Sequence, residues 1–178
     1  ALSGQQILLR TQKRVQWWLG KCLWIVLNAI IFFAIGYAVI ICFASVGGNL
    51  SLKPSNDIVR VYCEMDVSGV NTGSLLAAVT VLPLITAIAL SLLQTTLAII
   101  LKPIYAFLLI ACVMVASAYF FTWVLPGNHI MLLRNALMMD GGIPTPFSLA
   151  YMTVLALASI IVGCVVFRRY DILNKEPS

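Results

Sequence analysis

The chain has 178 residues, of which 62% are hydrophobic and only 10% are charged. A soluble domain of this size would expose large apolar patches with such a composition, which excludes an ordinary soluble protein and indicates an integral membrane protein. The net charge of +5 would suggest a nucleic-acid partner in a soluble chain. In a membrane protein, an excess of Lys and Arg mainly reflects which loops lie in the cytoplasm. We therefore expect the lipid bilayer as the first partner, and we expect no nucleic-acid partner.

Residues 1–21 form the first expected element, a basic amphipathic helix on the cytoplasmic side. Its cations share one side of a helical projection, with aliphatic side chains opposite. Tryptophans lie near its end, at the place where indole rings favour the lipid headgroups. The pattern predicts an interfacial helix that lies along the membrane surface. The cations are Arg10, Lys13, Arg14 and Lys21, and the tryptophans are Trp17, Trp18 and Trp24.

Four apolar segments are each long enough to cross a hydrocarbon core about 30 Å thick. The second contains Pro83, which removes a helical hydrogen bond and should bend that span, and Lys102–Pro103 marks a tight turn after it. We therefore expect an all-α, polytopic helical membrane protein, with residues 1–178 forming a single transmembrane domain. The expected spans are 22–46, 74–101, 104–125 and 147–167, with loops at 47–73 and 126–146 and a tail at 168–178.

The cations predict the orientation of these spans, because loops that remain in the cytoplasm carry an excess of Lys and Arg. With both termini inside, eight of the eleven cations are cytoplasmic and that side has a balance of +6, whereas the two outer loops come to −1. An even number of crossings is consistent with both termini on one side. We expect a multi-pass protein of the bacterial plasma membrane, with both ends of the chain in the cytoplasm.

The loop 126–146 contains a run that is too apolar for a free loop and too short to cross the membrane. It predicts a short re-entrant or interfacial helix on the outer face, stopped by Gly141–Gly142. His129, Arg134 and Asp140 are its ionisable residues. A single histidine beside a glycine and an asparagine is more often a loop or interface residue than a proton carrier.

No catalytic or metal-binding motif is present in the sequence: there is no phosphate-binding loop, no HExxH and no second histidine at ligand spacing. We expect no metal and no enzymatic activity. No carboxylate falls inside an expected span, which argues against an ion-coupled pump. Polar residues within the spans either line a substrate path or form hydrogen bonds between helices, and the second interpretation is the more common. They are Asn28, Gln94, Thr95, Thr96, Ser117, Thr122 and Ser159.

The layout resembles the permease subunits of type-2 ABC transporters, which pair with a cytoplasmic ATPase and mostly export. In that family a cytoplasmic coupling helix, followed by a leucine-glycine-lysine sequence, leads into the third span. The passage that looks similar here consists of Gly4–Thr11, Lys13–Arg14 and Trp17–Lys21. The family's short external helix pair between its last two spans resembles residues 126–146. Its basic cytoplasmic end resembles Phe167–Asp171. The family has two spans before the coupling helix that have no counterpart ahead of Gly4, so the resemblance implies either that the chain is the last two thirds of a permease or that two further spans precede residue 1 in the full-length protein.

The resemblance implies a non-catalytic subunit that moves an amphiphilic substrate (a peptide, lipid, glycan or drug) out of the cytoplasm. Its partners would be an ABC ATPase, which holds ATP and Mg, and a second permease subunit, identical or different. Permeases of bacteriocin and lantibiotic immunity or export are the most similar in size. The alternative is a stand-alone immunity, binding or structural membrane protein without transport. The residues implied in coupling to the ATPase are Gly4, Leu8, Leu9, Arg10, Lys13 and Arg14.

Overall fold

The computed structural model describes residues 14–48 and 71–169, and all of its regular elements in these ranges are helices. Three helical stretches are long and apolar enough to cross a membrane, and a fourth apolar helix is shorter. The prediction of an all-α chain with long apolar helices is confirmed for these residues. The elements are α2 (Arg14–Val46), α4 (Thr72–Leu76), the π-helix η1 (Ala77–Val81), α5 (Leu82–Ile100), α6 (Pro103–Tyr119), α7 (Pro126–Ile130), the 3₁₀-helix η2 (Leu132–Arg134) and α8 (Thr145–Arg169).

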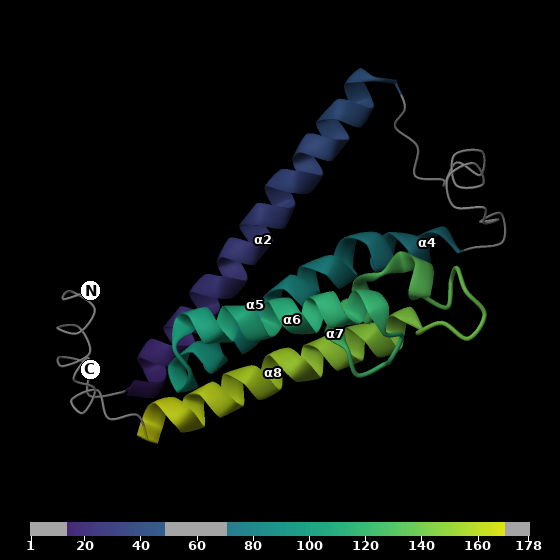
Figure 1. Ribbon diagram of the computed structural model, residues 1–178. Coiled ribbons are helices and arrows are strands. Elements are labelled where there is room, and N and C mark those ends of the chain that lie inside the picture. The colour runs from purple at the N-terminus through teal and green to yellow at the C-terminus, as the bar shows by residue number, and fades with distance from the viewer. Residues whose placement is uncertain (1–13, 49–70, 170–178) are drawn as a thin grey trace.

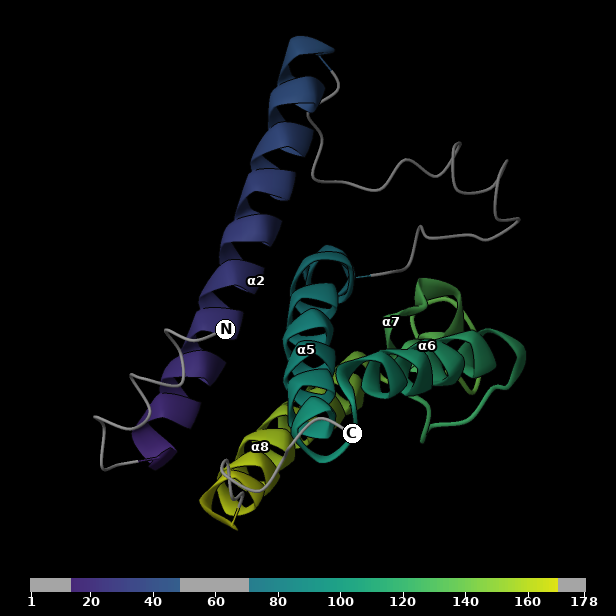
Figure 2. The same cartoon turned by 60° about the vertical axis from the view of Figure 1, so that its left-hand side comes forward.

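Helix α2 runs without a break from Arg14 to Val46, so the expected boundary between a leader and a span at Cys22 is not a break in the helix. Its first turns pack against the end of α8, and the rest diverges from the other helices (Figure 1). Figure 2 shows the same divergence from a second direction. Further along α2, the Tyr37 hydroxyl donates a hydrogen bond to the backbone oxygen of Thr80 in η1 at 2.6 Å.

The second long stretch, Thr72–Ile100, is helical throughout but contains the π-helical turn η1 just before Pro83. The amide of Leu82 bonds to the oxygen of Ala77, five residues earlier, instead of the usual four. Proline has no amide hydrogen to donate, so an irregular turn at this place is the expected consequence. The distortion predicted from Pro83 is therefore present, as a local widening of the helix.

Helix α5 lies at the centre of the bundle and contacts α2, α6 and α8. Its buried residues recur every three or four positions, which places them along one face of the helix. Across this face, the Thr96 hydroxyl donates to the backbone oxygen of Ser159 in α8 at 2.9 Å. The buried residues of α5 are Leu82, Thr86, Ala89, Leu92 and Thr96.

Two helix boundaries differ from the prediction. Helix α6 ends at Tyr119 and not at Leu125, because Phe120 is already extended, with φ −110° and ψ 123°. The predicted helix before Gly141–Gly142 is replaced by two short pieces, α7 and η2, and then by turns. The chain leaves the helix at Asn135, whose side-chain oxygen accepts the Leu137 amide while its backbone bridges to Ile143.

Candidate functional site

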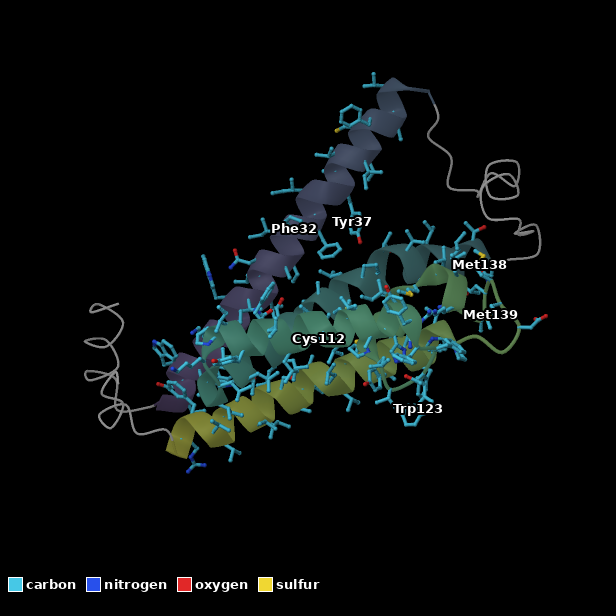
Figure 3. All side chains as sticks on the ribbon, viewed as in Figure 1. Phe32, Tyr37, Cys112, Trp123, Met138 and Met139 are labelled. Atoms are coloured by element: carbon cyan, nitrogen blue, oxygen red, sulfur yellow. The ribbon has the colours of Figure 1, made fainter. Side chains whose placement is uncertain are left out.

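Most of the buried polar side chains among the described residues gather where α6, α7, η2 and α8 meet. We call this group the polar cap. Six of its members are buried, and their partners come from the same group or from nearby backbone. The loop between α6 and α8, which carries most of the polar cap, lies at the end of the bundle where Trp123, Met138 and Met139 are labelled in Figure 3. The polar cap consists of Ser117, Asn128, His129, Arg134, Asn135, Thr145 and Ser148.

Arg134 binds the exposed end of α6 through its guanidinium group. One nitrogen donates to the oxygen of Ser117 at 2.5 Å and the other to the oxygen of Ala118 at 2.8 Å. The first nitrogen also contacts Phe120 O at 3.3 Å and the side-chain oxygen of Asn128. The last carbonyls of a helix have no partners within it and carry partial negative charge. Arg134 thus supplies both the donors and the positive charge that this helix end requires.

Asn128 ties down the chain that follows α6. Its side-chain nitrogen donates to Phe120 O at 2.9 Å and to Thr122 O at 2.7 Å. The preceding Gly127 amide donates to the Ser117 hydroxyl at 3.2 Å. A Cβ atom at Gly127 would lie 2.5 Å from the Cβ of Ser117, so only glycine allows α7 to approach α6 this closely.

His129 connects this segment to α8. Its Nε2 lies 2.8 Å from Trp123 O, which can only accept a hydrogen bond, so Nε2 carries the proton in the neutral ring. Nδ1 therefore accepts from the Ser148 hydroxyl at 3.0 Å. The ring also stacks on Tyr151, with centroids 4.5 Å apart.

The other end of the loop is closed by Asn135. Its amide nitrogen donates to the Thr145 hydroxyl at 3.0 Å, which links the loop to the first residue of α8. Backbone bonds join Ala136 N to Ile143 O at 3.1 Å and Ile143 N to Arg134 O at 2.9 Å. The loop is therefore a closed unit whose polar groups pair internally.

The expected ionisable residues of the external segment separate into two groups. His129 and Arg134 are both in the polar cap and are linked through Asn128, next to His129 in the chain. Asp140 is exposed at the loop tip. Neither cap residue is free to bind a ligand through its present donors, because His129 uses both ring nitrogens and Arg134 is engaged by backbone oxygens.

The expected substrate-path residues do not come together. Asn28 is exposed on α2 and donates to Trp24 O in its own helix, at 2.8 Å. Gln94 and Thr95 are half-buried on α5, and Thr95 donates to Ser91 O at 2.7 Å. The other two lie at the polar cap: Ser117 is buried in it, and Thr122 O accepts from Asn128.

The predicted coupling residues Gly4, Leu8, Leu9, Arg10 and Lys13 lie outside the described residues, and Arg14 is the first residue of α2. Within the described ranges no group of three or more His, Cys, Asp or Glu side chains could hold a metal ion.

Sequence reasoning missed a second packed site, at the opposite end of α8 from the polar cap, which we call the tryptophan dock. The Trp18 indole is fully buried over Gly163 and donates from its Nε1 to Ile160 O at 3.1 Å. The rings of Phe167 and Trp17 stack, with their centroids 5.2 Å apart. The only available signal was a glycine within an apolar span, which often marks a close helix approach. The dock consists of Trp17, Trp18, Cys22, Gly163 and Phe167.

Comparison with curated proteins gives no match, and comparison with solved structures gives none either. One family matches residues 3–173, nearly the whole chain, and it is described as a protein of unknown function, DUF2705. The chain therefore belongs to the DUF2705 family.

Proposed function

We propose that this chain is the membrane-spanning permease part of an ATP-driven exporter, placed in the bacterial plasma membrane with both ends cytoplasmic. The observation that carries the proposal is the sparse attachment of α2 to the rest of the bundle. Helix α2 is long enough to span, and none of the residues in its most apolar stretch is buried. Its contacts with α8 and α5 and the Tyr37 hydrogen bond leave most of its surface open to lipid or to further helices.

The divergence of α2 from its own bundle favours the hypothesis that the chain is one part of a larger assembly and does not work alone. Helices associate within lipid through close packing, and no side chain of α2 after Cys22 is buried. In the proposed transporter a second permease subunit, identical or different, packs beside α2. The substrate then moves between the two subunits and not through a channel inside one of them.

The described residues favour an amphiphilic substrate. The exposed face of α2 is almost entirely apolar, and the predicted path residues Asn28, Gln94 and Thr95 do not converge on a polar pocket. A route beside α2 would therefore suit a molecule that is largely apolar itself, such as a lipid, a glycolipid, a drug or an amphiphilic peptide.

The proposed source of energy is a separate cytoplasmic ABC ATPase that holds ATP and Mg. It would contact Gly4–Arg14, with Leu8 and Leu9 as apolar anchors and the neighbouring cations pairing with acidic groups or lipid phosphate. Because α2 continues through Trp18 into the dock, movement of this segment would be transmitted directly to α8.

The test is copurification of the chain, expressed with its genetic neighbours, from detergent. We expect an ATPase subunit to copurify and its ATP hydrolysis to be stimulated. The double variant Leu8→Asp/Leu9→Asp should abolish both effects, since it disrupts the apolar anchors and leaves every cation in place. The matched control, Gln5→Asp/Gln6→Asp, adds the same charge to the same segment and should retain both.

Absence of any ATPase from the purified native complex, with no nucleotide hydrolysis, would overturn the transporter proposal and favour a stand-alone immunity or binding protein. Retention of the ATPase by the Leu8→Asp/Leu9→Asp variant would instead restrict this segment to a membrane anchor.

A further inference from the structure

The segment between α6 and α8 is built with its polar groups inside and its apolar groups outside. Asn128 is 1% exposed and His129 is 2% exposed, whereas Phe120 is 64% exposed and Trp123 is 63% exposed. This is the reverse of the distribution expected for a loop in water. We call the outward-facing apolar residues the apolar rim: Phe120, Phe121, Trp123, Val124, Leu133 and Phe147.

We infer that the apolar rim is a lipid-contacting surface, so that the chain from Phe120 to Leu133 is set into the acyl region of the bilayer and does not lie in water outside it. The inference requires only that the chain spans a membrane, and it does not depend on the proposed transport activity.

The length of α6 supports this depth. Its 17 residues extend about 25 Å, which is less than the roughly 30 Å of a hydrocarbon core. If Pro103 lies at one membrane surface, Tyr119 has not reached the other. The extended residues that follow Tyr119 must then cover the remaining depth.

The contacts with α8 give the same depth independently. The apolar stretch Thr145–Arg168 has 24 residues, about 36 Å, which exceeds the core by about 3 Å at each end. Tyr151 lies six residues after Thr145, about 9 Å along the axis, and so about 6 Å inside the core. Its hydroxyl donates to Val124 O at 2.6 Å, and because a helical side chain leans toward the helix N-terminus, Val124 lies between that depth and the edge of the core.

Non-helical backbone is tolerated at membrane depth only where its polar groups are satisfied without water. The polar cap meets this requirement for five carbonyl oxygens at and just after the end of α6. Arg134 and Asn128 bind the carbonyls of Ser117, Ala118, Phe120 and Thr122, and His129 binds that of Trp123. A loop in water would have no need of these internal donors, since solvent would supply them.

The chemistry of the rim favours lipid over another protein as the covering partner. From Phe120 to Leu125 only Thr122 and the indole N–H of Trp123 offer a side-chain hydrogen-bonding group, whereas protein interfaces carry about one hydrogen bond per 100–200 Å². The rim also continues the apolar surface of α8, where Val154 and Leu157 are exposed. Asp140 and Asn71 are exposed and polar, and mark the region that remains in water.

The test uses the full chain with its five cysteines replaced by alanine, reconstituted in vesicles of phosphatidylcholine and phosphatidylglycerol. A nitroxide is attached at Phe121→Cys or Val124→Cys, with Val154→Cys as the matched lipid-facing control and Asp140→Cys as the water-facing control. We expect the labels at 121 and 124 to collide with oxygen as often as the label at 154 does, and to be shielded from a water-soluble nickel complex that reaches 140.

Accessibility to the nickel complex at 121 and 124 would overturn the inference, because the segment would then be a water-exposed loop. Shielding from both reagents would overturn it as well, because another protein segment would then cover the rim. A chain with all native cysteines gives a second measurement: brominated lipids should quench the part of the tryptophan fluorescence that Trp123→Phe removes. An unquenched Trp123 contribution contradicts a lipid-facing rim.

Discussion

The two ends of α8 are held by different interactions. At the tryptophan dock Trp18 fills a space that exists because Gly163 has no side chain, and a single hydrogen bond to Ile160 O fixes the indole. At the polar cap, Ser148 and Thr145 connect α8 to a network of hydrogen bonds. The dock depends on shape and the cap on donors and acceptors. A membrane helix pair can thus be held mainly by close packing with one hydrogen bond, whereas a helix end without a following helix requires several polar partners.

The largest effect is expected at Arg134. Arg134→Met removes the side-chain donors to Ser117 O and Ala118 O at the end of α6, at a cost of about 2–4 kcal/mol because hydrogen bonds to charged groups are among the stronger ones. Arg134→Lys keeps the charge and should recover only part of the loss, since one ammonium cannot reproduce the planar fork. Thermal unfolding of the purified chain measures both. Equal stability of wild type and Arg134→Met would contradict the role assigned to this residue.

A change at the dock should have the next largest effect. A Cβ atom at Gly163 would lie 2.1 Å from the Trp18 ring, so Gly163→Val must displace the indole, at a cost of about 1–3 kcal/mol. Because the polar cap is far along α8, its hydrogen exchange should remain unchanged while α2 loosens. Gly36→Ala on α2, where a Cβ meets nothing within 4 Å, is the control. A loss of protection at both ends of α8 would show that the dock and the cap are not independent.

Acidic pH should weaken the cap and leave the dock unaffected. Nδ1 of His129 accepts from the Ser148 hydroxyl only while that nitrogen is unprotonated. Protonation of the ring removes this acceptor, so the stabilisation that the bond provides is lost when the ring becomes charged. Ser148, Tyr151 and the Trp123 carbonyl contact the ring, and Arg134 is linked to it through Asn128.

Hydrogen exchange of the cap amides, corrected for intrinsic rates and measured from pH 8 to pH 5, tests this expectation. Protection should fall in the wild type and stay constant in His129→Gln, which has no titrating ring. A similar fall in the variant would assign the effect to another group.

The smallest effect is expected between the two ends, where α5 crosses α8. Thr96→Val removes the hydroxyl that bonds Ser159 O and retains the shape of the side chain. Hydrogen bonds of this kind between membrane helices average about 0.6 kcal/mol, so we expect a loss of that size in thermal or denaturant unfolding. A loss as large as that of Gly163→Val would mean that this crossing depends on polar contacts and not on packing.

The sequence by itself determined the class of the protein and the place of its long helices. Runs such as Cys22–Val46 have no charge, and only a helix satisfies their backbone groups within a membrane. It also indicated the distortion near Pro83, because the missing amide hydrogen is a local property of that residue.

Tertiary structure alone decided where α6 ends and which polar residues meet. No glycine or proline stops the helix at Tyr119. It stops there because Arg134 and Asn128, from later segments, bind the carbonyls that a continuing helix would have used. The pairing of Trp18 with Gly163 likewise joins residues from the two ends of the chain. Such contacts depend on how the helices are oriented about their axes, which periodicity cannot specify in segments that are apolar on every side.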